Sequence, residues 1–137
     1  MIKEYRKEQN GFDYRLPGGK VFDTLNEYKK ALETKVDLLQ CAIGAAKKEL
    51  KEETGISAKS IKLLKISKAG ATVDWDLYYF IANEFEEKSE EQNLELGEEI
   101  TAEWKTSDEI KQLCKEGKIN EDRTVGILLN LFLNKSK

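Results

Sequence analysis

The chain has 137 residues, of which 39% are hydrophobic and 36% charged, and its formal net charge is −3. This length and composition are typical of one soluble globular domain, expected here over residues 1–137. The sequence contains no His, which excludes histidine-based catalysis and His metal sites, and no Lys/Arg block indicates binding to nucleic acid.

A β-hairpin is predicted at the N-terminus. Two extended runs, 2–6 and 12–16, flank the dipeptide Asn10-Gly11, which is a strong hairpin signal. Pro17-Gly18-Gly19 follows and ends the second strand. Taken without its context, this Leu-Pro-Gly-Gly stretch is an ordinary turn.

Two helices are predicted after the turn. Thr24 and Glu27 have the form of a capping box and predict a short helix. One face of that helix is apolar and carries Leu25, Tyr28 and Leu32. Asp37 is a second capping signal, and the helix that it begins should end at Gly55, because glycine is the usual residue after a helix C-terminus.

The second half of the chain predicts three strands and two helices. The strands are expected at 61–67, 73–85 and 100–105, with an acidic loop at 86–97 before the last of them. A capping box at 106–109 and a cap at Asn120 begin the helices. The order β-β-α-α-β-β-β-α-α favours a mixed sheet with helices on its faces.

Glu49, Glu52 and Glu53 are predicted to lie in the last turn of the second helix. Residues at i, i+3 and i+4 are neighbours on a helix, where like charges repel, and the C-terminal end of a helix favours cations. By helical spacing Glu49 and Glu53 fall within the apolar stripe, with Glu52 on its edge. The turn is therefore either a solvated acidic helix end or a set of ligands for a divalent cation.

Other features of the sequence are consistent with a cytoplasmic protein. Cys41 and Cys114 are far apart and form no C-x-x-C pair, so we expect two small buried or half-buried residues. The charged N-terminal residues do not resemble a signal peptide. The longest apolar run, 126–133, is too short to span a bilayer.

Two motifs of the chain resemble the signature of the Nudix hydrolase family. Leu16-Pro17-Gly18-Gly19-Lys20 precedes the stretch 48–56, Lys-Glu-Leu-Lys-Glu-Glu-Thr-Gly-Ile. The family's box is G-x5-E-x7-R-E-U-x-E-E-x-G-U, with U a bulky aliphatic residue. The second half matches at every position except Arg, which is Lys48 here. Tyr5-Arg6 and the stretch 97–104 resemble the ADP-ribose pyrophosphatase branch.

The first half of the box differs from the family pattern. Its Glu would fall at Leu25 when counted from Gly19, and at Gln40 when counted back from Lys48. The extra residues between the two halves include the predicted short helix, so an insertion is expected around 24–35. In the family this Glu and the Arg form a supporting ion pair. Gln40 and Lys48 would replace that pair with a weaker contact.

The resemblance implies a fold and a cofactor. The fold is a Nudix-type α/β/α sandwich with a mixed β-sheet, abbreviated at its N-terminus, and the cofactor is Mg²⁺ or Mn²⁺. Glu49 and Glu53 would be the main ligands, Glu52 a ligand or water-activating base, and Gly19 would contribute its carbonyl oxygen. Divalent metals neutralise a diphosphate and activate a water for attack on it.

Further residues are candidates for the site by the same resemblance. Glu98 or Glu99 is expected as an extra ligand or general base, unless the pair is a solvated part of the loop. Arg6 and Arg15 are expected either to hold a phosphate or to be surface residues of strands. An adenine could stack on aromatic residues, which are also common in a core; the candidates are Trp75, Tyr14 and Phe12.

The resemblance implies hydrolysis of a nucleoside diphosphate linked to another moiety, of the ADP-ribose or nucleotide-sugar type. Two alternatives stay open: a nucleoside triphosphate pyrophosphohydrolase, and a catalytically impaired nucleotide-binding sensor of the same fold. Relatives of the ADP-ribose type carry further strands before the Tyr-Arg segment. We therefore expect a homodimer in which the partner covers an exposed sheet edge, with no nucleic-acid or membrane partner.

Overall fold

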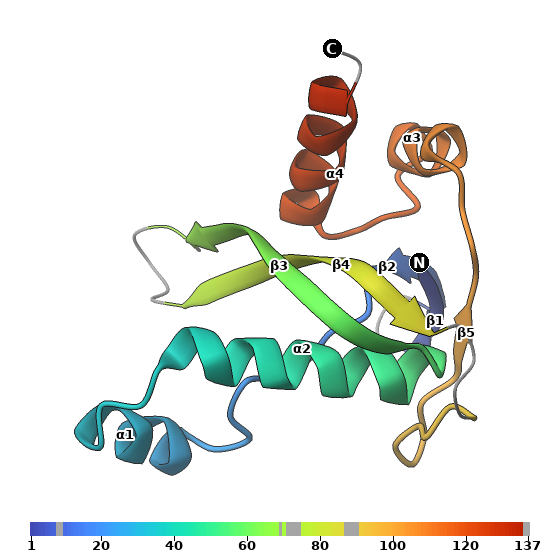
Figure 1. The fold of residues 1–137 in the computed structure, drawn as a ribbon. Helices are drawn as coiled ribbons and strands as arrows, with labels where there is room; N and C mark the ends of the chain where they lie inside the picture. Colours follow the sequence, from blue (N-terminus) through green and yellow to red (C-terminus); the bar gives the residue numbers. More distant parts are fainter. Residues whose placement is uncertain (8–9, 69, 71–74, 87–90, 136–137) are drawn as a thin grey trace. The chain divides into compact units, whose positions relative to one another are not determined.

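The computed structural model describes residues 1–7, 10–68, 70, 75–86 and 91–135. Its helices and strands follow the predicted order. Their bounds are β1 (Ile2–Arg6), β2 (Gly11–Arg15), α1 (Leu25–Glu33), α2 (Leu38–Thr54), β3 (Ser57–Lys68), β4 (Asp76–Glu86), β5 (Ile100–Ala102), α3 (Ser107–Lys115) and α4 (Asp122–Lys135) (Figure 1). No helix within the described ranges has both the length and the apolar composition that a bilayer span requires.

The chain divides into two compact units, and each is described by itself. One comprises Met1–Pro17 and Leu94–Lys137, and the other comprises Gly18–Asn93. The short helix expected around 24–35 is present as α1 and begins with the predicted capping box. A single domain over residues 1–137 stays a prediction.

The first unit contains a three-stranded antiparallel sheet in the order β2-β1-β5. The hairpin of β1 and β2 confirms the prediction, and Asn10 next to β2 has a φ of 47°, a left-handed conformation that Asn tolerates. Successive strand residues point to opposite faces, and one face is buried. The buried apolar residues of this unit are Ile2, Ile100, Ile119, Ile127 and Leu128.

Two helices follow the sheet in the same unit. α3 begins with the predicted capping box. α4 begins at Asp122, and the carboxylate of the preceding residue, Glu121, accepts a hydrogen bond of 3.1 Å from the Thr124 N–H. The capping position expected for Asn120 is therefore held by Glu121.

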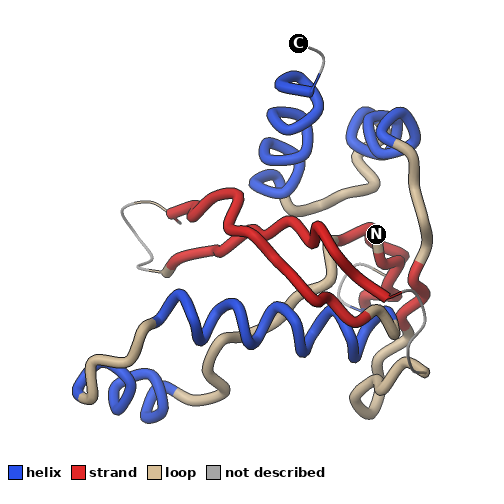
Figure 2. The backbone as a smooth tube through the Cα atoms, in the orientation of Figure 1, coloured by secondary structure: helices blue, strands red, loops and turns tan. Residues whose placement is uncertain are grey.

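The second unit pairs β3 with β4 as an antiparallel ribbon, and α2 lies against β3 (Figure 2). β3 is longer than the strand predicted at 61–67. β4 corresponds to the strand predicted at 73–85, of which residues 73–74 lie outside the described ranges. The long α2 thus runs along a two-stranded ribbon, and its C-terminal end carries the predicted glutamates.

Two observations modify the expected architecture. Every strand pairing among the described residues is antiparallel, so this part of the chain contains no parallel pair of the mixed sheet. The apolar face of α1 is largely exposed, by 65% at Leu25, 40% at Tyr28 and 49% at Leu32. Its amphipathic pattern therefore predicted the helix but did not place that face in the core.

Candidate functional site

The last turn of α2 carries Glu49, Glu52 and Glu53. Asp37 caps the start of this helix with its carboxylate, and Gly55 ends it with a φ of 72°, both as predicted. Glu53 is buried, with 7% of its surface exposed, whereas Glu49 and Glu52 are half-buried. The helical pattern thus correctly predicted that Glu53 points inward, where a carboxylate without partners would be costly.

The Gly18-Gly19 turn contacts two of these carboxylates. The Gly18 N–H donates a hydrogen bond of 2.9 Å to Oε2 of Glu53. A Cβ added to Gly19 would lie 2.1 Å from Oε1 of Glu49, so only glycine permits this close approach of the backbone to the carboxylate. The structure therefore brings the turn and two of the three glutamates together, although α1 and most of α2 separate them in the sequence.

Glu52 faces a lysine of its own helix. Nζ of Lys48 lies 3.5 Å from Oε2 of Glu52, and their side chains are 68% and 31% exposed. The charge of Glu52 raises the pKa of Lys48. Gln40, the expected counterpart of Lys48, lies eight residues earlier in the helix, about 12 Å along its axis. Lys48 thus supports Glu52 directly, through an exposed ion pair.

The oxygen atoms at this turn fit a hard divalent cation. Carboxylates and carbonyls are the ligands that Mg²⁺ prefers, and it commonly takes one or two carboxylates while water and phosphate oxygens complete its shell. Among the described residues, no three Cys, Asp or Glu side chains are grouped as a metal site. Glu49, Glu53 and the Gly19 carbonyl are ligands of the chemical type that such a cation takes.

Gln92 and Asn93 also reach the end of α2, which the sequence did not predict. The Gln92 side-chain amide donates a hydrogen bond to the backbone carbonyl of Glu53. The backbone N–H of Asn93 donates one of 2.9 Å to the carbonyl of Glu52. No residue type in this acidic stretch signals these contacts.

Arg6 and Arg15 lie on one face of the three-stranded sheet, where Glu4 joins them. Oε1 of Glu4 accepts a hydrogen bond of 2.8 Å from Arg6, and Oε2 accepts one of 2.6 Å from Arg15. Burial acts to raise the pKa of Glu4, but the hydrogen bonds from the two arginines outweigh it and lower the pKa. Glu4 was not among the predicted site residues, although its i, i+2 spacing to Arg6 in a strand was a usable signal.

Tyr14 points to the face of this sheet opposite Arg15, because neighbouring residues of a strand alternate. Nζ of Lys105 lies 5.6 Å from the centre of the Tyr14 ring. Phe12 shares this face, and its ring centre lies 5.5 Å from that of Tyr5. The predicted phosphate-binding and aromatic residues of the hairpin are therefore divided between the two faces.

The remaining predicted residues are Trp75, Glu98 and Glu99. Trp75, in the second unit, is 53% exposed. Glu98 and Glu99 belong to the first unit. The Glu98 carboxylate accepts a hydrogen bond of 2.9 Å from the Glu95 N–H, and the Glu99 carbonyl accepts one of 3.2 Å from Tyr5. Both contacts lie within the first unit, and neither involves a residue of α2.

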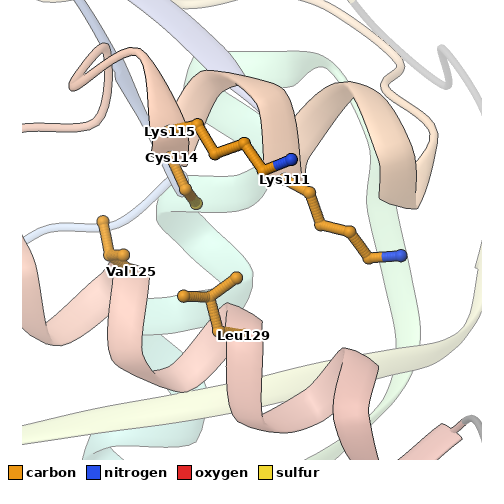
Figure 3. A pocket seen from close by; sticks show the side chains of 5 residues that line it. All are labelled: Lys111, Cys114, Lys115, Val125 and Leu129. Carbon is orange, nitrogen blue, oxygen red and sulfur yellow. The ribbon is translucent and has the colours of Figure 1, made fainter.

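A cavity of about 310 Å³ lies between α3 and α4. Its lining consists of Lys111, Cys114, Lys115, Val125 and Leu129 (Figure 3). No predicted site residue is among them. Burial raises the pKa of the Cys114 thiol, which opposes a nucleophilic role, and both cysteines are half-buried and free, as expected.

A comparison with protein families places these motifs in context. The family model described as NUDIX domain matches residues 1–125, and no curated protein matches the chain. The matched range contains both halves of the box and all candidate site residues, and it confirms the expected Nudix-type fold class. The chain therefore belongs to the Nudix family, whose domain is that of hydrolases acting on pyrophosphate bonds.

Proposed function

We propose that the protein is a metal-dependent hydrolase that cleaves the diphosphate of a nucleoside diphosphate linked to another moiety. ADP-ribose and nucleotide sugars are the favoured substrate class, as in the ADP-ribose pyrophosphatase branch that the N-terminal motif resembles. The observation that supports this proposal most strongly is the contact of Gly18-Gly19 with Glu53 and Glu49. It joins the two motifs of the family box at one helix end.

Glu49 and Glu53 would hold Mg²⁺ or Mn²⁺ together with the carbonyl oxygen of Gly19. When bound, such a cation neutralises charge on the diphosphate oxygens and lowers the pKa of a coordinated water. The hydrogen bond from Gly18 keeps the buried Glu53 side chain in one orientation, and the contact with Gly19 limits the positions open to Glu49. The turn therefore orients both ligands before substrate arrives.

Glu52 would act as a further ligand or as the base that takes the proton of the attacking water. Nζ of Lys48 lies 3.5 Å from its carboxylate in an exposed ion pair. Glu98 and Glu99 remain candidates for the same proton transfer. A base must lie within hydrogen-bond reach of the proton that it takes, so the activity of single Gln variants at the three positions would identify it.

Arg6 and Arg15 would bind a phosphate of the substrate. Glu4 accepts one hydrogen bond from each guanidinium, and the planar N–H groups of arginine match the geometry of phosphate oxygens. Tyr14 and Trp75 are proposed to stack on the base. Because Tyr14 and Arg15 point to opposite faces of the sheet, one substrate group cannot contact both side chains at the same time.

The experiment is a panel of nucleoside diphosphate derivatives and nucleoside triphosphates with Mg²⁺ or Mn²⁺, in which the phosphorylated products are identified. We expect a nucleoside monophosphate and a phosphorylated partner from the diphosphate derivatives, with a large loss of rate in Glu53→Gln. Glu33→Gln is the matched control, because Glu33 is an exposed glutamate at the end of α1. Turnover of triphosphates alone would instead support the pyrophosphohydrolase alternative.

One observation favours the sensor as a second candidate. The carboxylate of Glu52 is paired with Lys48, which competes with its use as a ligand or base. Tight nucleotide binding without metal-dependent turnover of any member of the panel would support the sensor.

A homodimer, a cytoplasmic location and a single domain are further parts of the proposal. A stable monomer in sedimentation at micromolar concentration would remove the homodimer.

A further inference from the structure

The last turn of α2 is held by a segment that lies far from it in the sequence. The final four carbonyls of a helix have no partner within the helix. In α2 the carbonyl of Lys51 accepts a hydrogen bond of 2.8 Å from the Gly55 N–H. The next two carbonyls, those of Glu52 and Glu53, accept from Asn93 and Gln92. The segment 92–93 thus supplies the partners that the helix lacks.

The two carbonyls bound in this way belong to candidate site residues. Glu53 is consequently held both at its backbone, by the Gln92 amide, and at its carboxylate, by the Gly18 N–H. Gln92 and Asn93 are themselves exposed. Within 87–93, the structure describes residues 91–93. The hydrogen bonds of Gln92 and Asn93 with α2 are polar contacts.

We propose that Gln92 and Asn93 are positioning residues for the cation held by Glu49, Glu52 and Glu53, an inference that rests on the proposed function. Helix ends fray when their terminal carbonyls lose their partners. A frayed last turn would let the side chains of Glu52 and Glu53 sample many orientations. Groups that orient metal ligands commonly contribute 10–100-fold to metal affinity. Such a contribution is expected here, and neither residue would itself be a ligand of the cation.

The test is a titration of the full chain with Mn²⁺ alone, in which calorimetry measures the heat of binding and gives the Kd. Gln92→Met keeps the length of the side chain and removes its N–H donor. Gln112→Met is the matched control, because Gln112 is an exposed glutamine of α3 that also donates a side-chain hydrogen bond, to Glu116. We expect Gln92→Met to raise the Kd for Mn²⁺ about tenfold or more, while Gln112→Met leaves it unchanged.

A second variant and a second readout separate positioning from loss of folded protein. Asn93→Pro removes the backbone N–H and should raise the Kd in the same direction. Excess metal should restore most of the hydrolysis rate of Gln92→Met, because the ligands are still present. A merely structural defect would lower the number of binding sites and the unfolding temperature and would leave the Kd of the folded fraction unchanged.

The outcomes distinguish this inference from the proposed function. If the unaltered protein binds Mn²⁺ and Gln92→Met binds it equally well, the positioning role is overturned and the metal site stands. If the unaltered protein does not bind Mn²⁺, the proposed function fails and the inference fails with it. A reduced number of sites at constant Kd also overturns the positioning role.

Discussion

The backbone of Gly19 touches the carboxylate of Glu49 so closely that a Cβ at position 19 would lie 2.1 Å from Oε1 and 3.0 Å from Oε2. No side chain can occupy that space unless one of the two groups moves. The Glu49 carboxylate is the end of a flexible side chain, so its rotation away from the turn is the least costly response. A methyl group at position 19 should therefore displace one proposed ligand and leave the fold intact.

Gly19→Ala should lower the affinity for Mn²⁺ and the rate of hydrolysis, each by about 10–100-fold, with little change in unfolding temperature. Gly18→Ala is the matched control, because a Cβ at position 18 meets no atom within 4 Å and the N–H that donates to Glu53 is retained. The measurements are Mn²⁺ titration and thermal unfolding of both variants. Equal metal affinity in Gly19→Ala and Gly18→Ala would contradict the assignment of Glu49 as a ligand.

Two glycines, one at the C-terminal end of α2 and one inside it, should change stability in opposite directions when replaced by alanine. Gly55 has a φ of 72°, where a side chain is strained, so Gly55→Ala should destabilise the fold by about 1 kcal/mol. Gly44 lies inside the helix, and a Cβ there meets no atom within 4 Å. Gly44→Ala should stabilise the fold by about 0.5–1 kcal/mol. Urea unfolding measures both, and a change of the same sign in the two variants would be inconsistent with the observed helix end.

Glu4 should make stability depend on pH in the acid range. Its pKa is lowered from the ordinary value of 4.5, so its contribution is fully present above that value and is lost as the pH falls through the lowered pKa. At neutral pH, Glu4→Gln should cost about 1–2 kcal/mol in the free energy of unfolding, because its partners are partly solvated.

The difference between the unaltered protein and Glu4→Gln should shrink as the pH falls from neutral to about 3. Urea unfolding across this range is the measurement, and Glu33→Gln, at an exposed position, is the control. A difference that stays constant with pH would show that Glu4 does not act through its charge on Arg6 and Arg15.

Lys48→Arg should raise the hydrolysis rate several-fold if Glu52 takes part in the reaction. A guanidinium can bind a carboxylate through two N–H groups, whereas the ammonium of Lys48 makes one contact of 3.5 Å and is a point charge. Lys62→Arg, at an exposed position of β3, is the control for a general effect of arginine. An unchanged rate in Lys48→Arg would indicate that the orientation of Glu52 does not limit turnover.

Local signals predicted the helices and strands because they act within a few residues. The capping boxes at the starts of α1 and α3, the cap at Asp37 and the stop at Gly55 are all present. The same 3.6-residue period placed Glu53 on the buried side of α2. For Leu25 the pattern was less informative, since amphipathicity shows that a face is apolar but not what covers it, and this residue is 65% exposed.

The parts of the site that join distant segments were not predictable from residue types. Every residue except proline has a backbone N–H, so nothing marks Asn93 as the partner of Glu52. The hydrogen bond between Gly18 and Glu53 also has a backbone N–H as its donor. Only the family box suggested that these two segments meet. Glu4 was overlooked because its role depends on Arg15, which the hairpin register brings onto the same face.

The most direct test of the account is the metal dependence of diphosphate cleavage by the unaltered protein, Glu53→Gln and Glu33→Gln. Products are separated and quantified with and without Mg²⁺ or Mn²⁺. We predict equal amounts of a nucleoside monophosphate and a phosphorylated partner, formed only with metal, nearly abolished in Glu53→Gln and unchanged in Glu33→Gln. Cleavage that is independent of metal, or equal in the two variants, would contradict the site at the end of α2.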